Sequence, residues 1–174
     1  MKTSIALIGF MGTGKTAVGK ILAEKLDKHF IELDELIEKR AGKSINEIFR
    51  GGEIAFREME IVAVKEVAGR KNQVISCGGG VILNRINIDR LKQESVIVLL
   101  TASPAIILKR TSTSNDRPLL NTNDRLQSIR ELLKFRRPFY ERAADITINN
   151  TGLSIEEVAA RIIDKLRQDE GFNI

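Results

Sequence analysis

Residues 9–16 read Gly-Phe-Met-Gly-Thr-Gly-Lys-Thr and fit the pattern G-x-x-x-x-G-K-[ST] throughout. The glycines let backbone N–H groups curl around phosphate oxygens, and a helix beginning here adds a favourable dipole for an anion. Lys15 can reach the β- and γ-phosphates of a nucleotide, and the Thr16 hydroxyl can ligate Mg²⁺. A chance match on a glycine-rich turn is the alternative, but an apolar run precedes the segment and an amphipathic pattern follows it. The segment therefore predicts a phosphate-binding loop.

Two carboxylates, Glu32 and Asp34, end the next β-prone run. In an open parallel sheet, ligands bind outside the carboxyl ends of the strands, so we expect both residues near the phosphate-binding loop. One carboxylate can hold the water shell of a metal ion, and another can accept a hydroxyl proton. The alternative is that Asp34 only caps a helix at residues 34–40.

A run of three glycines follows a third β-prone run, in the sequence Cys-Gly-Gly-Gly at residues 77–80. Consecutive glycines permit a close approach of the backbone to a ligand, and the alternative is a plain loop. Cys77 has no histidine nearby in the sequence, so we interpret it as a small packing residue rather than a nucleophile.

Three arginines complete the set of residues that suggest chemistry. Arg57 lies on a predicted helix, Arg117 in a polar stretch at 111–123, and Arg136 late in a basic helical pattern. A guanidinium group offers a planar, permanently charged fork of donors that suits carboxylate and phosphate. Each arginine alone is more often a surface residue than a ligand contact. Together with a phosphate-binding loop, they predict an acid-binding pocket and a mobile lid at about 111–123.

The elements that position these residues alternate along the chain. Short β-prone runs predict strands at residues 4–8, 30–33, 73–76, 96–101 and 146–149. Helical patterns occupy residues 15–26, 34–40, 44–49, 53–69, 105–110 and 124–143, and a last helix begins at the capping box formed by Ser154 and Glu157. Strands separated by helices predict a five-stranded parallel sheet with helices on both faces, an α/β fold in three layers.

The composition is that of one ordinary domain, residues 1–174, with 43% hydrophobic and 29% charged residues. A single cysteine and a single histidine exclude an internal disulfide and a Cys/His zinc site. The longest apolar run is far too short to span a membrane, and the first residues lack the features of a signal peptide. We therefore expect a cytoplasmic protein without a membrane partner.

The net charge of +5 is concentrated in one segment. Residues 109–142 carry nine Lys or Arg and four Asp or Glu, so this segment accounts for the whole excess. A basic segment in an otherwise neutral chain indicates an anionic ligand, such as a nucleotide, an organic acid or a nucleic acid. A solvated basic helix face is the alternative.

Taken in order, these motifs resemble shikimate kinase, a small ATP-dependent kinase family of the nucleoside-monophosphate-kinase-like group. The resemblance runs from the phosphate-binding loop to residue 145 and rests on GFMGTGKT, LDELIEKR, AGKSINEIF, the FR of IAFREME, SCGGG, RPLL and RRPFYERAAD. Each motif after the first is weak alone, but their order and spacing are specific. The resemblance implies a P-loop kinase fold with a mobile lid and an acid-binding segment at about 34–60.

The resemblance also implies roles for individual residues. The implied shikimate-binding residues are Asp34, Arg57, Gly78, Gly79, Gly80 and Arg136. Among them, Arg57 and Arg136 take the carboxylate, while Asp34 holds the ring hydroxyls and accepts the proton of the 3-hydroxyl. Glu60 lies one helical turn after Arg57 and can orient its guanidinium.

On the nucleotide side, the predicted ATP-binding residues are Gly12, Thr13, Gly14, Lys15, Thr16, Ala17, Arg110 and Arg117. The resemblance places Arg110 beside the adenine and Arg117 on the lid at the transferring phosphate, which with Lys15 and Asp34 completes the predicted catalytic set. The segment at 149–152 matches the adenine-side loop of the family loosely. The family usually has Asp-x-Asp where this chain has Glu32 and Asp34, so we predict Thr16 as a ligand of Mg²⁺ and Glu32 in its outer shell.

The implied reaction is transfer of the γ-phosphoryl group of ATP to the 3-hydroxyl of shikimate, a step towards chorismate and the aromatic amino acids, by a chain that we expect to be a monomer. One alternative is a P-loop kinase for another small hydroxy acid, such as gluconate. Another is a non-catalytic ATP-binding module whose basic face binds nucleic acid. The basic segment lacks interleaved aromatic residues along its length, so we expect no nucleic-acid partner.

Overall fold

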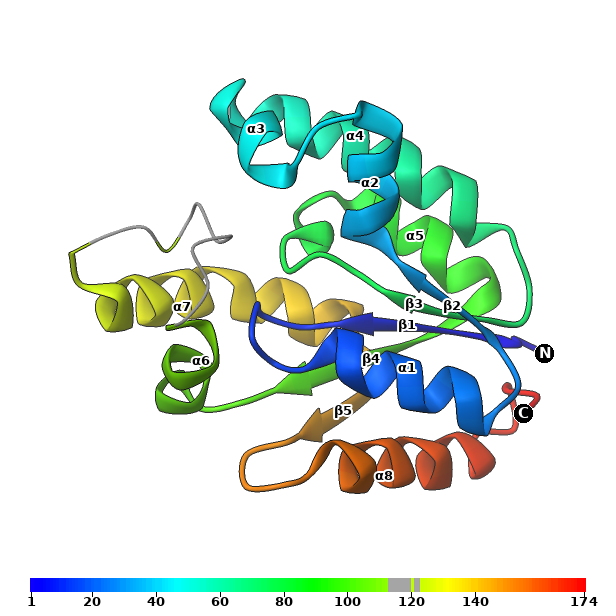
Figure 1. Cartoon of the computed structure of the whole chain (residues 1–174). Helices are drawn as coiled ribbons and strands as arrows, with labels where there is room; N and C mark the ends of the chain where they lie inside the picture. The colour runs from blue at the N-terminus through cyan, green and yellow to red at the C-terminus, as the bar shows by residue number, and fades with distance from the viewer. Residues whose placement is uncertain (113–119, 121–122) are drawn as a thin grey trace.

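The structure of the chain, a computed structural model, describes residues 1–112, 120 and 123–174. Within these residues, five strands pair in parallel in the order β2-β3-β1-β4-β5, and helices lie above and below them (Figure 1). The strands are β1 (Ser4–Ile8), β2 (His29–Glu32), β3 (Gln73–Ser76), β4 (Ser95–Thr101) and β5 (Ile146–Asn149). The predicted α/β class and five-stranded parallel sheet are confirmed.

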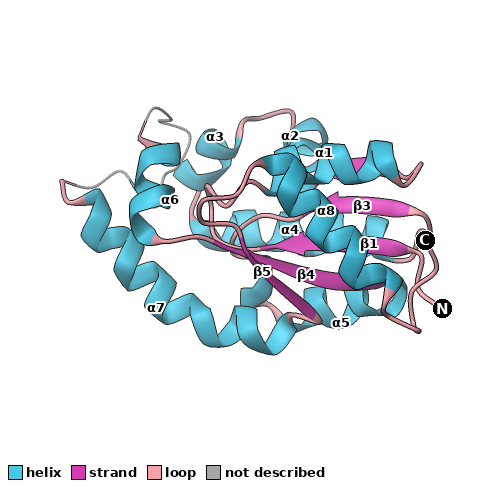
Figure 2. Cartoon of the chain, turned by 90° about the horizontal axis from the view of Figure 1, so that it is seen from below, coloured by secondary structure: helices cyan, strands magenta, loops and turns pink. Residues whose placement is uncertain are grey.

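Helices cover both faces of the sheet. One face is covered by α1 (Lys15–Lys25) and α8 (Ile155–Arg167), which lie in front of the strands in Figure 2. The remaining helices pack towards the opposite face: α2 (Leu33–Ala41), α3 (Ile45–Arg50), α4 (Glu53–Ala68), α5 (Arg85–Glu94), α6 (Pro104–Thr111) and α7 (Arg125–Ala143). None of the helices in the described ranges is long and apolar enough to cross a membrane.

Strand β4 carries a continuous apolar run at residues 96–100 because both faces of the strand are covered. In β4, Ile97 and Leu99 pack into the cluster beneath α4, α5 and α7. Val96, Val98 and Leu100 pack into the cluster beneath α1 and α8. All five side chains are buried, as the continuous apolar run predicts for a strand between two helical layers.

Polar capping residues fix where several helices begin. The Ser154 hydroxyl accepts from the backbone N–H of Glu157, whose carboxylate accepts from the N–H of Ser154, so the predicted capping box is confirmed. At α6 the Ser103 hydroxyl accepts from the backbone N–H of Ile106, without a reciprocal side chain, and Pro104 occupies the first helical position. These caps satisfy backbone donors that the first helical turn leaves without partners.

The prediction missed two elements between β3 and β4: α5 and the short 3-10 helix η1 (Val81–Leu83). In α5, only Ile88 and Leu91 are buried apolar residues, so the helical stripe is narrow. Asn84 precedes the helix but makes no side-chain capping hydrogen bond. The two usual sequence signals of a helix, a broad apolar stripe and a capping residue at the N-terminus, were therefore both weak here.

The first three strands all end at the same edge of the sheet, and this edge carries the predicted site. The phosphate-binding loop follows β1, α2 follows β2, and the glycine run follows β3. Helix α2 begins at Leu33 with Glu32 as its N-cap residue, so Asp34 is already inside the first turn. The alternative in which Asp34 caps this helix is therefore wrong.

Candidate active site

The loop between β1 and α1 is shaped by three glycines. Gly9, Gly12 and Gly14 have φ angles of 146°, 77° and 86°, a backbone region that other residues rarely adopt. Lys15 folds back over the loop, where its Nζ donates hydrogen bonds to the carbonyl oxygens of Gly9 (2.9 Å) and Phe10 (3.1 Å). The ammonium group is thus held at the mouth of the loop, where a phosphate would approach it.

Two side chains from distant segments brace this loop. The Nη1 atom of Arg110 donates to the carbonyl oxygen of Gly12 at 3.2 Å, which places this predicted ATP-binding residue beside the loop. Asn150 is buried and donates from Nδ2 to the carbonyl oxygen of Thr13. The sequence pointed to the segment at 149–152 but did not single out Asn150. Its only signal was its position directly after β5, at the same edge of the sheet.

The Thr16 hydroxyl donates a hydrogen bond of 2.6 Å to Oε2 of Glu32. Burial raises the pKa of the Glu32 carboxyl, while the hydrogen bonds from Thr16 and Ser76 lower it. The longer side chain at position 32 therefore reaches the predicted metal ligand directly. A hydroxyl beside a carboxylate is the kind of oxygen donor set that holds Mg²⁺ together with phosphates and water, so these residues fit that ion.

A cavity of about 230 Å³ joins the phosphate-binding loop to the two carboxylates and the glycine run. Its lining therefore brings together predicted ATP-binding and predicted substrate-binding residues. The lining residues are Met11, Gly12, Gly14, Lys15, Thr16, Ala17, Glu32, Asp34, Ser76, Cys77, Gly78 and Gly79.

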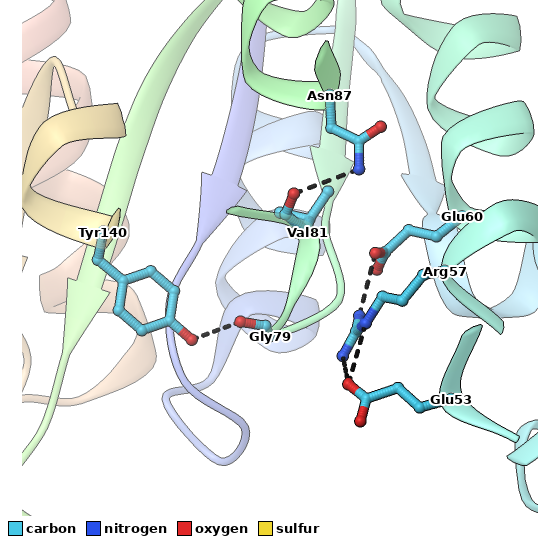
Figure 3. A network of polar contacts seen from close by, with 7 residues as sticks. All are labelled: Glu53, Arg57, Glu60, Gly79, Val81, Asn87 and Tyr140. Atoms are coloured by element: carbon cyan, nitrogen blue, oxygen red, sulfur yellow. Dashed lines mark hydrogen bonds and ion pairs between the residues drawn. The ribbon is translucent and has the colours of Figure 1, made fainter. Parts of the chain in front are cut away.

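Arg57 is held between two carboxylates of its own helix (Figure 3). Its Nη1 donates to Oε1 of Glu60 at 3.0 Å, and its Nη2 donates to Oε1 of Glu53 at 3.0 Å. Burial raises the pKa of Glu60 to about 7, against the opposing effect of the Arg57 charge and hydrogen bond. The prediction that Glu60 orients Arg57 is confirmed.

Arg136 has a different environment. Its side chain is buried, and its guanidinium carbon lies 5.8 Å from the centre of the Phe10 ring. Within the described residues, none of the ion pairs includes Arg136. A buried cation without a paired carboxylate favours the binding of an anion, because the anion supplies the missing charge.

The turn at Gly78, Gly79 and Gly80 is the point at which these groups converge. A Cβ atom at Gly78 would lie 3.0 Å from Oδ1 of Asp34, and one at Gly79 would lie 3.5 Å from Nη1 of Arg136. A Cβ atom at Gly80 would collide with the Arg57 guanidinium at 2.3 Å. A side chain at any of the three positions would press against a neighbouring group, so the glycines keep Asp34, Arg57 and Arg136 close to the backbone of the turn.

The remaining predictions have different outcomes. Cys77 is buried, and burial raises the pKa of its thiol, which confirms a packing role rather than a nucleophilic one. Arg117 and most of the proposed lid at 111–123 lie outside the described residues. Sequence reasoning did not single out Tyr140 or Asn87, although both contact the glycine turn or the residue after it.

Comparison with known proteins supports the same assignment. A family model described as shikimate kinase matches residues 11–167. The chain is 51% identical over 161 residues to the shikimate kinase of Caldanaerobacter subterraneus subsp. tengcongensis, covering 92% of this chain and 94% of that protein. It is 48% identical to the shikimate kinase of Thermodesulfovibrio yellowstonii, with 92% of each chain covered.

Solved structures agree with these sequence matches. The structure described as shikimate kinase from Acinetobacter baumannii in complex with shikimate is similar with a TM-score of 0.94 and 36% identity, covering 98% of this chain and 96% of that one. Shikimate kinase from Aquifex aeolicus is similar with a TM-score of 0.82 and 36% identity, covering 95% and 96%. The chain therefore belongs to the shikimate kinase family.

Proposed function

We propose that the chain transfers the γ-phosphoryl group of ATP to the 3-hydroxyl of shikimate. The observation that carries this proposal is the convergence of Asp34, Arg57 and Arg136 on one glycine turn, which lines the same cavity as the phosphate-binding loop. The relative from Acinetobacter baumannii, whose structure is described as a shikimate complex, supports the choice of acid.

The acid side of the site recognises a carboxylate and activates a hydroxyl. Arg57, beside Gly80, and Arg136, beside Gly79, bind the carboxylate. Asp34 holds the ring hydroxyls and accepts the proton of the attacking 3-hydroxyl, in its position between that turn and the cavity. The acid is thereby oriented with one hydroxyl towards the phosphate-binding loop, and this positioning lowers the barrier to transfer.

The nucleotide side stabilises negative charge on the transferring group. Lys15 and the loop N–H groups contact the β- and γ-phosphates, while Arg110 lies on the adenine side. When Mg²⁺ is bound, it neutralises phosphate charge, and we propose that the Thr16 hydroxyl ligates it with Glu32 in the outer shell. The role of Arg117 on the lid remains a prediction from the resemblance.

The wider arrangement belongs to the same proposal. Residues 1–174 form one kinase domain, with the acid-binding segment at about 34–60 and the lid at about 111–123. We expect the chain to act as a monomer in the cytoplasm, where ATP and small organic acids are available.

A coupled assay of ADP release tests the proposal. Wild-type protein is incubated with ATP and Mg²⁺ in the presence of shikimate, of gluconate, or of neither acid. We expect ADP formation to depend on shikimate, with little stimulation by gluconate. Stimulation by gluconate alone would favour the other small-acid kinase, and ADP formation that no acid stimulates would contradict an acid kinase altogether.

A further inference from the structure

The glycine turn has no side chains of its own with which to hold its position. A Cβ atom at Gly80 would nevertheless collide with the Arg57 guanidinium at 2.3 Å, and one at Gly79 would already be in van der Waals contact with Arg136 at 3.5 Å. A small displacement of the turn would therefore change the space between the two guanidinium groups. Backbone hydrogen bonds from Val81 to Gly78 and from Leu83 to Gly80 close the turn locally. Figure 3 shows two side chains from other helices that tie it to the rest of the protein, one at Gly79 and one directly after the turn.

Tyr140 on α7 is the first of these side chains. Its hydroxyl donates a short hydrogen bond to the carbonyl oxygen of Gly79, and the side chain is 4% exposed. Burial raises the pKa of Tyr140 to about 12, while the charge and hydrogen bond of Arg136 act in the opposite direction. One phenol oxygen therefore contacts both the turn and a guanidinium group of the acid site.

Asn87 on α5 is the second. It is 0% exposed, and its Nδ2 donates to the carbonyl oxygen of Val81 at 3.2 Å, directly after the turn. Its Oδ1 has no hydrogen-bond partner within the described residues. Burying an amide oxygen without a partner costs stability, so an apolar side chain would pack here more favourably unless the amide has a task. Holding the end of the glycine turn is the task that its contact shows.

We propose that Tyr140 and Asn87 are positioning residues for the acid site, which fix the glycine turn at the spacing that shikimate needs between Arg57 and Arg136. The inference rests on the proposed function for the identity of the acid. Neither residue contacts the phosphate-binding loop through a hydrogen bond in the described part of the chain. The turn also packs against the phosphate-binding loop at Gly9 and Met11, so loss of either contact should weaken recognition of the acid more than recognition of ATP.

The chain offers a matched control on the nucleotide side. Asn150 is also buried, also donates from Nδ2 to a loop carbonyl, and also has an Oδ1 without a hydrogen-bond partner in the described structure. Its acceptor is Thr13 in the phosphate-binding loop instead of Val81. Asn87→Leu and Asn150→Leu thus remove the same chemistry from the two binding regions in turn, with a side chain of similar shape.

The experiment measures KM for shikimate, KM for ATP, kcat and the melting temperature in Tyr140→Phe, Asn87→Leu and Asn150→Leu. We expect Tyr140→Phe and Asn87→Leu to raise the shikimate KM about fivefold or more, with the ATP KM and kcat within about twofold of wild type. Asn150→Leu should show the reverse pattern for the two KM values. A purely structural role would lower the melting temperature and leave the shikimate KM unchanged, and that result in Tyr140→Phe would overturn the proposal.

Amide hydrogen exchange separates failure of this proposal from failure of the proposed function. If the wild type forms no ADP in response to shikimate, the proposed function falls, but exchange across residues 78–83 still reports the turn. The positioning role then predicts faster exchange there in Tyr140→Phe and Asn87→Leu than in Asn150→Leu. Equal exchange in all three variants would overturn it. If Asn87→Leu does not fold, Tyr140→Phe decides alone, because it removes a single oxygen atom.

Discussion

The phosphate-binding loop and the proposed acid-binding pocket meet at one cavity, which Asp34, Gly78 and Gly79 line on the acid side, yet the two regions are built in different ways. The loop is one continuous segment whose glycines and Lys15 lie within eight residues of sequence. The pocket gathers Asp34, Arg57 and Arg136 from three helices around a turn that follows a fourth element, β3. A local site of the first kind depends on backbone conformation, whereas a distributed site depends on how elements pack against one another.

The two arginines of the pocket sharpen this contrast. Arg57 is already paired with Glu53 and Glu60, so its charge is partly compensated before any ligand binds. Arg136 contacts neutral groups, the Phe10 ring and Tyr140, and none of the described ion pairs includes it. In the free protein, ion pairs with two carboxylates therefore hold the Arg57 guanidinium in place. The Arg136 guanidinium is instead held by burial among neutral groups.

The largest effect is expected on the nucleotide side. Lys15→Ala should lower the rate of phosphoryl transfer by about a thousandfold, because the ammonium group stabilises charge on the transferring phosphate. Its loss should leave the affinity for shikimate within about twofold of wild type, since the acid contacts the other region. The assay is ADP release, with circular dichroism and a shikimate titration as controls. Retention of most of the activity would remove this loop from the mechanism.

The next prediction concerns the two arginines. Arg57→Ala and Arg136→Ala should each weaken shikimate binding by about 2–4 kcal/mol, the scale for truncating one partner of a desolvated charge pair. Arg136→Ala should have the larger effect. Unlike Arg57, the buried Arg136 takes part in none of the described ion pairs, so the carboxylate of the ligand would be its ion-pair partner. Calorimetry with shikimate, and with an ATP analogue as control, measures both. Unchanged shikimate affinity in both variants would place the acid elsewhere.

Glu32 lines the cavity between the phosphate-binding loop and the glycine turn, and its substitution tests the proposed Mg²⁺ site. If its carboxylate lies in the outer shell of Mg²⁺, Glu32→Ala should raise the Mg²⁺ concentration for half-maximal activity by about three- to tenfold. Glu32→Asp should be tolerated, because it keeps the charge and restores the residue type that the family usually has. Identical Mg²⁺ dependence in wild type and Glu32→Ala would mean that Glu32 only ends a strand.

A last prediction concerns stability and leaves activity aside: the pH dependence of unfolding at Glu60. Burial raises the pKa of this group to about 7, so the folded state holds the proton more tightly than the unfolded chain does. The resulting stabilisation is fully present below about pH 4.5 and is lost as the pH rises through about 7. Relative to Glu60→Gln, which does not titrate, the wild type should lose up to about 3 kcal/mol across this range, because each pKa unit corresponds to about 1.4 kcal/mol.

Urea unfolding at several pH values measures this difference. Only the change in the difference with pH is informative, because Glu60→Gln also alters the pairing of Arg57 at every pH. A difference that stays constant from pH 4.5 to pH 7.5 would show that the Glu60 proton is not linked to folding.

The contrast between the regions explains how much the sequence predicted. The loop at 9–16 was predicted completely, because its motif lies within one strand-to-helix connection. The acid-binding arginines were predicted through the resemblance, since neither Arg57 nor Arg136 carries a local signal of its partners. The five strands were predicted to within a residue of their observed ends, because each central strand is a short apolar run.

The residues that hold the site in place were not predictable from pattern. Tyr140 and Asn150 act through contacts across 61 and 137 residues of sequence, and no periodicity encodes such contacts. Asn87 lies on α5, the helix that the prediction missed because its buried stripe is narrow. Glu60 is the exception, because it reaches Arg57 within one helical turn of the same helix.

Product analysis by phosphorus NMR tests the central claim most directly. Wild-type protein is incubated with ATP, Mg²⁺ and equal concentrations of shikimate and gluconate, and the phosphorylated products are identified from their signals. The account predicts ADP together with shikimate phosphorylated at the 3-hydroxyl, and no phosphorylated gluconate. A phosphorylated gluconate signal, a phosphate on another hydroxyl of shikimate, or inorganic phosphate as the only product besides ADP would contradict it.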